Sequence, residues 1–203
     1  MLPLKYKLVL GSQSPRRYEL LSGLDVDFVV RTPLHSDENY PLTLAASEVP
    51  LFLAKQKSLA LMNTLTTDEL LLTADTVVVL ENGEILGKPS DRSEAMQMLQ
   101  RLSGGRHTVI SGVAFSLYDG IHFADAISSE VYFATLSNDE IAYYLDHYHP
   151  YDKAGAYGIQ EWIGYIGITK IEGSFYNVMG LPIQLIYKTL RDWHLYEKNI
   201  VPL

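Results

Sequence analysis

The chain has 203 residues, of which 47% are hydrophobic and 20% are charged, and its formal net charge is −8. These proportions are typical of a globular protein and exclude a largely disordered chain. The absence of cysteine excludes disulfides, thiolate metal sites, iron–sulfur clusters and a cysteine nucleophile. The acidic balance argues against sequence-independent nucleic-acid binding, which needs a basic surface to displace counterions.

The length predicts one α/β domain over residues 1–203, with room for two lobes. No apolar run approaches the roughly 18 residues of a membrane span. The first ten residues lack the long apolar segment and small-residue cleavage site of a secretory signal. We therefore expect a cytoplasmic protein with neither membrane nor nucleic acid as a partner.

Strands and helices alternate along the first part of the chain. Strands are predicted over 6–11, 26–31 and 69–80. Pro15 and Gly23 stand where a helix over 15–22 would begin and end. A second helix is predicted over 47–63, with Ser47 as a candidate N-cap and Pro50 in its first turn.

Beyond residue 80 the pattern predicts three more helices and further strands. Asp91 and Glu94 resemble a capping box before a helix over 91–102, and Ser137 and Glu140 do so before a helix over 138–148. The expected buried positions of these helices are Ala95, Met98, Leu99, Leu102, Ile141, Tyr144, Leu145 and Tyr148. Asp119-Gly120 predicts a hairpin turn, a strand follows over 164–172, and a last helix spans 182–192. Helices mixed with a hairpin favour a mixed sheet over a purely parallel one.

The segment Gly11 to Arg17 (GSQSPRR) joins a strand to a helix N-terminus. Free backbone N–H groups and the helix dipole favour an anion there, whereas cations in the first turn are disfavoured. Arg16 and Arg17 are therefore explained by a bound phosphate. An ordinary Ser14-Pro15 cap with solvated arginines explains the pattern about as well.

A single carboxylate, Asp75, interrupts the apolar run 70–80. Because a buried unpaired charge costs several kcal/mol, two interpretations remain. Asp75 lies at a strand break facing a cleft, as a general base or metal ligand, or it caps a tight turn between two strands. The first is favoured, because buried carboxylates concentrate at active sites.

Two further segments break local rules. Lys88 stands between Gly87 and Pro89, which fits either a rigidly presented charge or a surface turn. The glycines and alanines of 151–160 suggest close approach of the backbone to a ligand, with a plain connecting loop as the alternative. The six histidines show no H-x-x-x-H spacing, and neither a nucleophile-elbow nor a P-loop motif is present.

Taken in order, these segments closely resemble the Maf family of nucleoside triphosphate pyrophosphatases, from about residue 8 to 190. The matching motifs are SxSPRR (12–17), ADTVV (74–78), GKP (87–89), LSGxxHxV (102–109), DKAGAYGIQ (152–160) and GSxxNVxGLP (173–182). The resemblance implies a fold related to inosine-triphosphate pyrophosphatases, with a mixed sheet, flanking helices and two lobes around a deep cleft. It also implies hydrolysis of a nucleoside triphosphate to the monophosphate and pyrophosphate, helped by Mg²⁺ or Mn²⁺.

Family roles carry over to the matching positions. Asp75 matches the carboxylate that accepts a proton from the attacking water, and Glu38 matches a loop glutamate that helps to hold metal. The expected phosphate-binding residues are Ser12, Ser14, Arg17, Lys57 and Lys88. Arg16, Thr76 and Gln160 resemble the subgroup that acts on dTTP and UTP rather than the one that takes 7-methyl-GTP.

The chain departs from the family pattern at two places. Glu161 and Trp162 follow Gln160 where the family usually has Gly. The stretch 39–52 follows the family pattern only loosely, with Lys55 and Lys57 both available and Ser58 where Ala is usual. Modified nucleotides remain alternative substrates. A nucleotide-sensing regulator of septum formation remains an alternative function, and a homodimer remains an alternative to a monomer.

Overall fold

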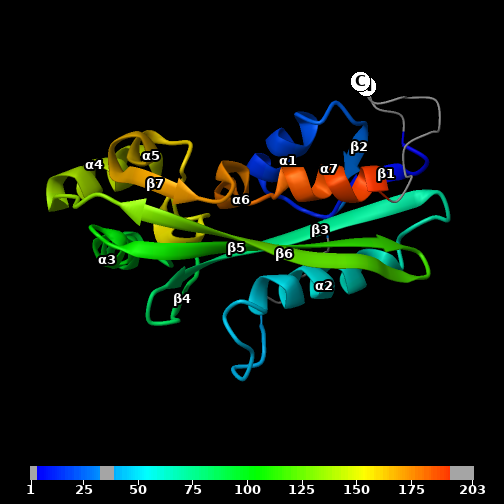
Figure 1. The fold of residues 1–203 in the computed structure, drawn as a ribbon, viewed down its shortest axis with the longest axis horizontal. Helices are drawn as coiled ribbons and strands as arrows, with labels where there is room; N and C mark the ends of the chain where they lie inside the picture. Colours follow the sequence, from blue (N-terminus) through cyan, green and yellow to red (C-terminus); the bar gives the residue numbers. More distant parts are fainter. Residues whose placement is uncertain (1–3, 33–38, 193–203) are drawn as a thin grey trace. The chain divides into compact units, whose positions relative to one another are not determined.

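The structure is a computed structural model that describes residues 4–32 and 39–192 (Figure 1). Its described residues fall into two compact units. Unit 1 is drawn from Met1–Asp75, Ser111–Ile127 and Gly180–Leu203, and unit 2 from Thr76–Ile110 and Ser128–Met179. The expected single domain over 1–203 stays a prediction.

The strands form a mixed sheet of the order β2-β1-β3-β5-β6-β7, with β4 paired to β3. Strand β1 is parallel to β2 and β3, whereas β4 is antiparallel to β3 and β7 to β6. The mixed α/β class expected from the sequence is therefore confirmed. The strands are β1 (Lys7–Leu10), β2 (Phe28–Val30), β3 (Glu69–Leu80), β4 (Ile85–Leu86), β5 (Arg106–Leu117), β6 (Gly120–Phe133) and β7 (Ile168–Glu172).

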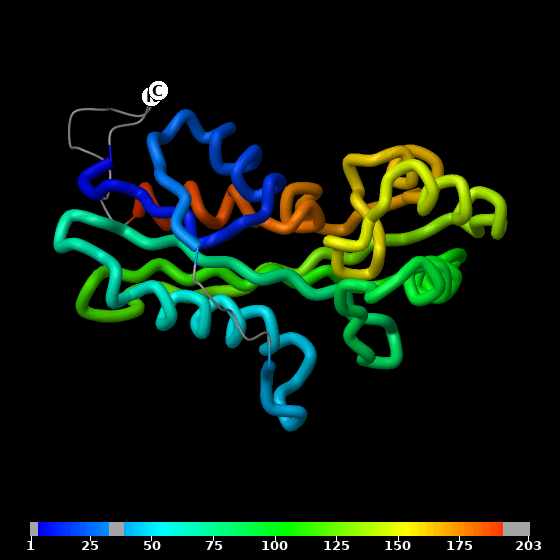
Figure 2. The backbone as a smooth tube through the Cα atoms, turned by 180° about the vertical axis from the view of Figure 1, so that it is seen from behind, coloured from blue at the N-terminus to red at the C-terminus, as the bar shows by residue number. Residues whose placement is uncertain are grey.

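Unit 1 places helices on both faces of its strands. Helices α1 (Pro15–Ser22) and α7 (Ile183–Asp192) lie on one side, and α2 (Val49–Met62) lies on the other (Figures 1 and 2). Helix α2 is bonded to the strands: Thr73 Oγ1 of β3 donates to the Ala54 carbonyl at 2.8 Å, and the Ser58 and Ser116 hydroxyls are hydrogen-bonded to each other.

Gly112 of β5 allows α2 to pack this closely. A Cβ at this position would lie 2.5 Å from the Leu51 backbone nitrogen, nearer than any side chain tolerates. The absence of a side chain therefore sets the approach of the first turn of α2 to the sheet.

Unit 2 packs helix α3 (Arg92–Leu102) against α4 (Asn138–Tyr148) and the short 3₁₀ helix η1 (Ala154–Ala156). Helices α5 (Trp162–Gly167) and α6 (Phe175–Met179) complete the unit. Its buried apolar side chains include Ala95, Met98, Leu99 and Leu102 from α3 and Ile141, Tyr144 and Leu145 from α4.

The strongest sequence signals gave correct bounds. Strand β3 spans the predicted residues, and α3 and α4 each match within one residue. Ser137 and Glu140 form a reciprocal capping box, and Asp91 caps α3 by accepting from the Glu94 backbone N–H. The Glu94 carboxylate accepts from Ser90 rather than from Asp91, so the second box is incomplete.

Three local predictions were wrong. Ser47 does not cap α2, which begins at Val49 after Glu48. Tyr148, expected in the core, is 38% exposed at the last residue of α4. Residues 162–167 form helix α5, so the strand predicted from residue 164 begins only at Ile168.

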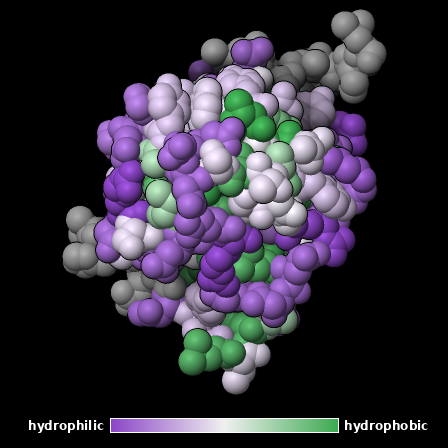
Figure 3. Space-filling view, turned by 90° about the vertical axis from the view of Figure 1, so that its left-hand side faces the viewer, coloured by the Kyte–Doolittle hydropathy of each residue, from purple (hydrophilic) through white to green (hydrophobic). Residues whose placement is uncertain are grey.

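Within the described residues, no helix is both long enough and apolar enough to cross a membrane. Figure 3 shows one face of the chain, on which hydrophilic residues predominate and hydrophobic ones lie in small separate patches.

An ion pair links β2 to β3 in the parallel part of the sheet in unit 1. Arg31, after β2, donates to Glu69, at the start of β3, through two hydrogen bonds of 3.0 and 2.7 Å, and β1 lies between those strands. The Glu69 side chain is only 11% exposed, and its second oxygen also accepts from the Thr66 N–H. The hydrogen bonds from Arg31 hold the pKa of Glu69 below its ordinary value.

Glu69→Gln should lower the free energy of unfolding by about 1–3 kcal/mol at pH 7, because a charged hydrogen-bond pair is lost. A carboxyl whose folded-state pKa is lowered stabilises fully above its unfolded pKa and loses that contribution as pH falls through the folded one. The difference between wild type and variant should therefore shrink between pH 7 and pH 3 in urea denaturation. Glu19→Gln, on the exposed face of α1, is the control. If the difference in unfolding free energy between wild type and Glu69→Gln were as large at pH 3 as at pH 7, the ion pair would not be its cause.

Candidate active site

The loop between β1 and α1 is held by its own serines. Ser14 caps α1 through its side chain, which accepts from the Arg17 N–H, and the Ser12 hydroxyl accepts from the Ser14 N–H at 3.2 Å. A Cβ on Gly11 would lie 2.7 Å from the Thr73 side chain, so the start of the loop lies tightly against β3. The predicted Ser14 cap is confirmed.

Arg17 joins this loop to two other segments of unit 1. Its Nε donates to the Gly180 carbonyl at 2.9 Å and its Nη1 to the Ala74 carbonyl at 2.8 Å, with Ser12 Oγ at 3.4 Å from Nη1. Arg17 is thus not the solvated arginine of the simpler interpretation. It is fixed one residue from Asp75, with its charge beside the helix N-terminus.

Asp75 is buried and paired with Lys57 of α2. The Lys57 ammonium contacts Asp75 Oδ1, and the two side chains are 12% and 10% exposed. Asp75 lies within the continuous strand β3, so both expected backbone settings, a strand break and a turn cap, are wrong. The pairing singles out Lys57 over Lys55, which is exposed on the same helix.

Unit 1 therefore gathers much of the predicted site. Ser12, Ser14, Arg17, Lys57 and Asp75 are linked by hydrogen bonds or by the β3 backbone, and Arg16 lies half-buried in the first turn of α1. Glu38, the predicted metal residue, lies outside the described residues.

The other predicted residues belong to unit 2. Thr76 follows Asp75 in β3, and Lys88 is exposed on the loop that leads into α3. That loop is bonded to the segment 151–160, because the Gly155 N–H donates to the Gly87 carbonyl at 3.0 Å. Gly155 adopts φ +69°, a left-handed conformation that favours glycine.

Gln160 lies in a tight turn, closed by the Glu161 N–H donating to the Gly158 carbonyl at 3.0 Å. Its side-chain Oε1 is buried and finds no hydrogen-bond partner among the described residues. An unpaired buried acceptor costs about 1–3 kcal/mol, so its presence in a folded chain needs an explanation.

The residue before this turn is fixed by a buried histidine. His107 Nε2 and the Tyr157 hydroxyl are 2.7 Å apart, and both rings pack against Phe133. Burial lowers the pKa of His107 to about 4, so the imidazole is neutral near pH 7.

Unit 2 also brings together three residues that the sequence pattern does not mark as a group. Lys153 is 8% exposed and pairs with Glu161, whose other oxygen accepts from the Tyr144 hydroxyl. The sequence pattern places Tyr144 in the core and marks Glu161 only as a departure from a family pattern. The available signal is a lysine directly before three small residues, 154–156, followed eight positions later by a carboxylate.

Within residues 4–32 and 39–192, no group of three or more His, Cys, Asp or Glu side chains is arranged to hold a metal ion. Among the predicted residues described here, Asp75 supplies the carboxylate oxygens. Mg²⁺ is commonly held by one or two carboxylates together with substrate phosphates, and this donor set fits an ion that arrives with a triphosphate.

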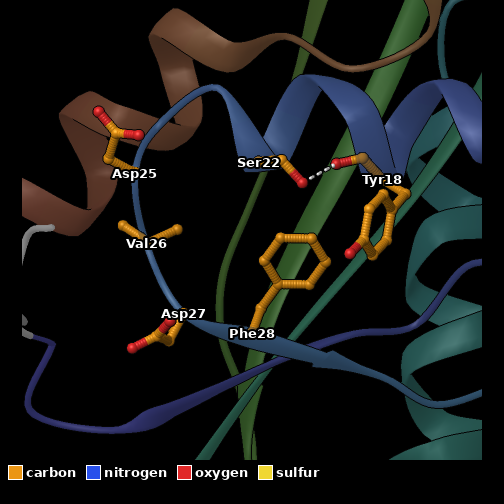
Figure 4. A pocket seen from close by; sticks show the side chains of 6 residues that line it. All are labelled: Tyr18, Ser22, Asp25, Val26, Asp27 and Phe28. Carbon is orange, nitrogen blue, oxygen red and sulfur yellow. Dashed lines mark hydrogen bonds between the residues drawn. The ribbon is translucent and has the colours of Figure 1, made fainter.

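A separate open pocket of 390 Å³ lies beside α1 in unit 1 (Figure 4). It is lined by Tyr18, Ser22, Asp25, Val26, Asp27 and Phe28, with the rings of Tyr18 and Phe28 packed edge to face. None of the predicted site residues lines it, and its carboxylates do not suit a phosphate ligand.

Comparison with known proteins decides the family. A family model described as "Maf-like protein" matches residues 7–193. The chain belongs to the Maf family. The family assignment expected from the motifs is thereby confirmed.

Curated relatives are similar over nearly the whole chain. A Porphyromonas gingivalis protein named dTTP/UTP pyrophosphatase is 55% identical over 191 residues, which cover 93% of this chain and 95% of the relative. Proteins of the same name from Parabacteroides distasonis and Bacteroides fragilis are 54% and 52% identical, each over 93% of this chain and 97% and 96% of the relatives.

Among solved structures, a HAM1 protein from Coxiella burnetii is similar with a TM-score of 0.47 and 14% identity, over 92% of this chain and 99% of that one. A dITP/XTP pyrophosphatase from Mycobacterium abscessus has a TM-score of 0.43 at 13% identity, over 91% and 93% of the two chains.

The Lys57–Asp75 pair predicts an asymmetric response to mutation in this Maf protein. Lys57→Met should lower the free energy of unfolding by about 3 kcal/mol, because it leaves a buried carboxylate without its cation. Lys55→Met, on the exposed face of the same helix, should change it by less than about 0.5 kcal/mol. Chemical denaturation measures both.

Adding Asp75→Asn to Lys57→Met should restore part of the lost stability, since the unpaired charge is removed. Equal effects of the two lysine substitutions would contradict the pairing.

Proposed function

We propose that this chain hydrolyses nucleoside triphosphates, with dTTP and UTP preferred, to the monophosphate and pyrophosphate. The observation that carries the proposal is the buried Asp75–Lys57 pair beside the Arg17-bound loop. The relatives named dTTP/UTP pyrophosphatase support both the reaction and the bases.

In this proposal Asp75 is the general base. A water molecule loses a proton to the Asp75 carboxylate as its oxygen attacks the α-phosphorus, and the bond between that phosphorus and the bridging oxygen to the β-phosphate breaks. Pyrophosphate leaves with the bonding electron pair. Direct attack by water is the economical route, because the chain has no cysteine nucleophile.

The phosphate chain is assigned to Ser12, Ser14, Arg17, Lys57 and Lys88. Cations and backbone N–H groups at a helix N-terminus stabilise the negative charge that gathers on the leaving pyrophosphate. Lys57 has a double role here: it compensates the charge of Asp75 before substrate binds and turns toward a phosphate afterwards. Arg17 stays fixed by the carbonyls of Ala74 and Gly180.

A divalent cation, Mg²⁺ or Mn²⁺, belongs to the proposal. When bound it would neutralise phosphate charge and polarise the α-phosphoryl group. Glu38 and an Asp75 oxygen are the residues that would hold it, alongside the phosphates of the substrate.

Base selection is assigned to Arg16, Thr76 and Gln160. The edge of uracil or thymine presents one N–H between two carbonyl acceptors, and the carboxamide of Gln160 can accept from that N–H. Gln160 Oε1 is a buried acceptor without a partner among the described residues, and a nucleobase donor that gains access to it would satisfy it.

The decisive experiment measures pyrophosphate release by the purified chain with Mg²⁺ and with Mn²⁺. The substrates are dTTP, UTP, CTP, GTP and 7-methyl-GTP. Preference for dTTP and UTP supports the whole proposal, while preference for another base keeps the hydrolase and removes the specificity assignment. Tight binding with no release from any of them would favour a nucleotide-sensing regulator instead.

Asp75→Asn should reduce kcat by about 10²-fold or more with the fold intact, because the general base is lost. Release of pyrophosphate under saturating dTTP, with a circular dichroism melt as the folding control, measures this. Wild-type turnover in the Asn variant would remove Asp75 from the mechanism and make Glu38 the next residue to test.

Gln160→Ala should lower the preference for UTP over CTP by about tenfold, because a site built to hydrogen-bond one base edge discriminates through that bond. The measurement is kcat/KM for both nucleotides. Gln97→Ala, on the exposed face of α3, is the matched control. An equal loss for UTP and CTP would show that Gln160 does not read the base.

A further inference from the structure

The turn that carries Gln160 is tied to a buried cluster of unit 2, here called the Glu161 cluster: Tyr144, Lys153, Gly158 and Glu161. Glu161 is the N-cap residue of α5, yet its side chain makes no capping hydrogen bond. Its carboxylate instead contacts α4 and the segment before the turn. A residue placed only to begin α5 would direct its oxygens at the free N–H groups of that helix.

Tyr144 bridges the two ends of the turn. Its hydroxyl accepts from the Gly158 N–H at 3.0 Å and donates to Glu161 Oε2. The ring is fully buried on α4. Burial, and secondarily the bond to Glu161, raises the pKa of Tyr144, so the phenol keeps the proton that it donates.

Lys153 holds the second carboxylate oxygen. Its ammonium lies 3.1 Å from Glu161 Oε1 and 2.8 Å from Asp152 Oδ1. The side chains of Lys153 and Glu161 are 9% and 19% exposed, against 55% for Asp152, so Glu161 is the inner partner of the lysine. Both oxygens of Glu161 are thus engaged from different elements.

Glycines leave room for this arrangement. A Cβ on Gly158 would lie 2.8 Å from the Glu161 carboxylate carbon, and a Cβ on Gly164 would lie 1.8 Å from the Ile159 carbonyl oxygen. The carboxylate therefore lies directly over the turn, and α5 packs directly beneath it. Gln160 stands between these two contacts, in a backbone that has little freedom to move.

We propose that Glu161 is a positioning residue for base recognition: through Tyr144 and Lys153 it fixes the turn 158–161 and so the direction of the Gln160 carboxamide. The inference rests on the proposed role of Gln160.

The test compares Glu161→Gly, Glu161→Gln and Tyr144→Phe for kcat and KM on dTTP, UTP and CTP. Glu84→Gln is the matched control, because it removes the carboxylate of an exposed ion pair with Arg101 in the same unit. Glu161→Gly should raise KM for dTTP and UTP about tenfold with kcat nearly unchanged, and should reduce the preference for UTP over CTP.

The other variants should rank by the contacts they keep. Tyr144→Phe should move selectivity in the same direction, and Glu161→Gln should have a smaller effect, since an amide oxygen still accepts from Tyr144. A double variant of Tyr144→Phe with Glu161→Gly should cost little more than Glu161→Gly alone. Equal loss of kcat/KM for all three nucleotides, or unchanged selectivity, would overturn the inference.

Hydrogen exchange gives a readout independent of turnover. Glu161→Gly and Tyr144→Phe should speed exchange in residues 157–161 and leave the rest of unit 2 protected, whereas faster exchange throughout the unit would mark a merely structural role and overturn the inference. An active wild type with unchanged base preference in Glu161→Gly would overturn the inference alone. A wild type that releases pyrophosphate from no nucleotide would overturn the proposed function, and the inference with it.

Discussion

The charge of Asp75 is the constraint on which unit 1 depends. A carboxylate placed between Ala74 and Thr76 in a buried strand must be compensated, or its desolvation would cost several kcal/mol. Compensation comes from Lys57. Helix α2 must therefore be positioned along β3, and rotated about its own axis, so that Lys57 reaches Asp75. The hydrogen bond from Thr73 to the Ala54 carbonyl and the close approach at Gly112 fix that crossing. A chemical requirement at one atom thereby dictates how a whole helix packs.

The same argument explains what could be predicted in unit 1. Strand β3 was readable because its apolar run is long, and Asp75 was noticeable because it breaks that run. The sequence did not predict that Lys57 pairs with Asp75, or that Asp75 lies within a continuous strand. Lys55 and Lys57 are two residues apart on one helix, and only the rotation of α2 decides which one faces the strand. That rotation is a property of the packed structure rather than of any local pattern.

Unit 2 shows where composition misleads. Residues 162–168 combine two aromatics, three isoleucines and two glycines. The aromatic and β-branched residues are typical of a strand, yet 162–167 form a helix. The close fit of Gly164 over the Ile159 carbonyl allows this turn of helix and overrides its weak local preference. The Glu161 cluster could not be predicted from the sequence for a related reason. Tyr144 fits the pattern of buried positions in a helix whether or not its hydroxyl makes specific hydrogen bonds.

A buried lysine–carboxylate pair occurs in each unit, and their surroundings separate their roles. Glu161 is bound through both oxygens, by Tyr144 and by Lys153, so displacing either partner would leave a buried group unsatisfied. Such a pair is suited to fixing the backbone of the turn 158–161. Asp75 meets Lys57 through Oδ1, on a strand whose preceding carbonyl already holds Arg17. In the proposed reaction the divalent cation that arrives with the triphosphate would have to replace Lys57 as the partner of Asp75, because the bare buried carboxylate would otherwise cost several kcal/mol. On the proposed function, the Asp75–Lys57 pair exchanges partners during the reaction, whereas the Glu161–Lys153 pair keeps its partners.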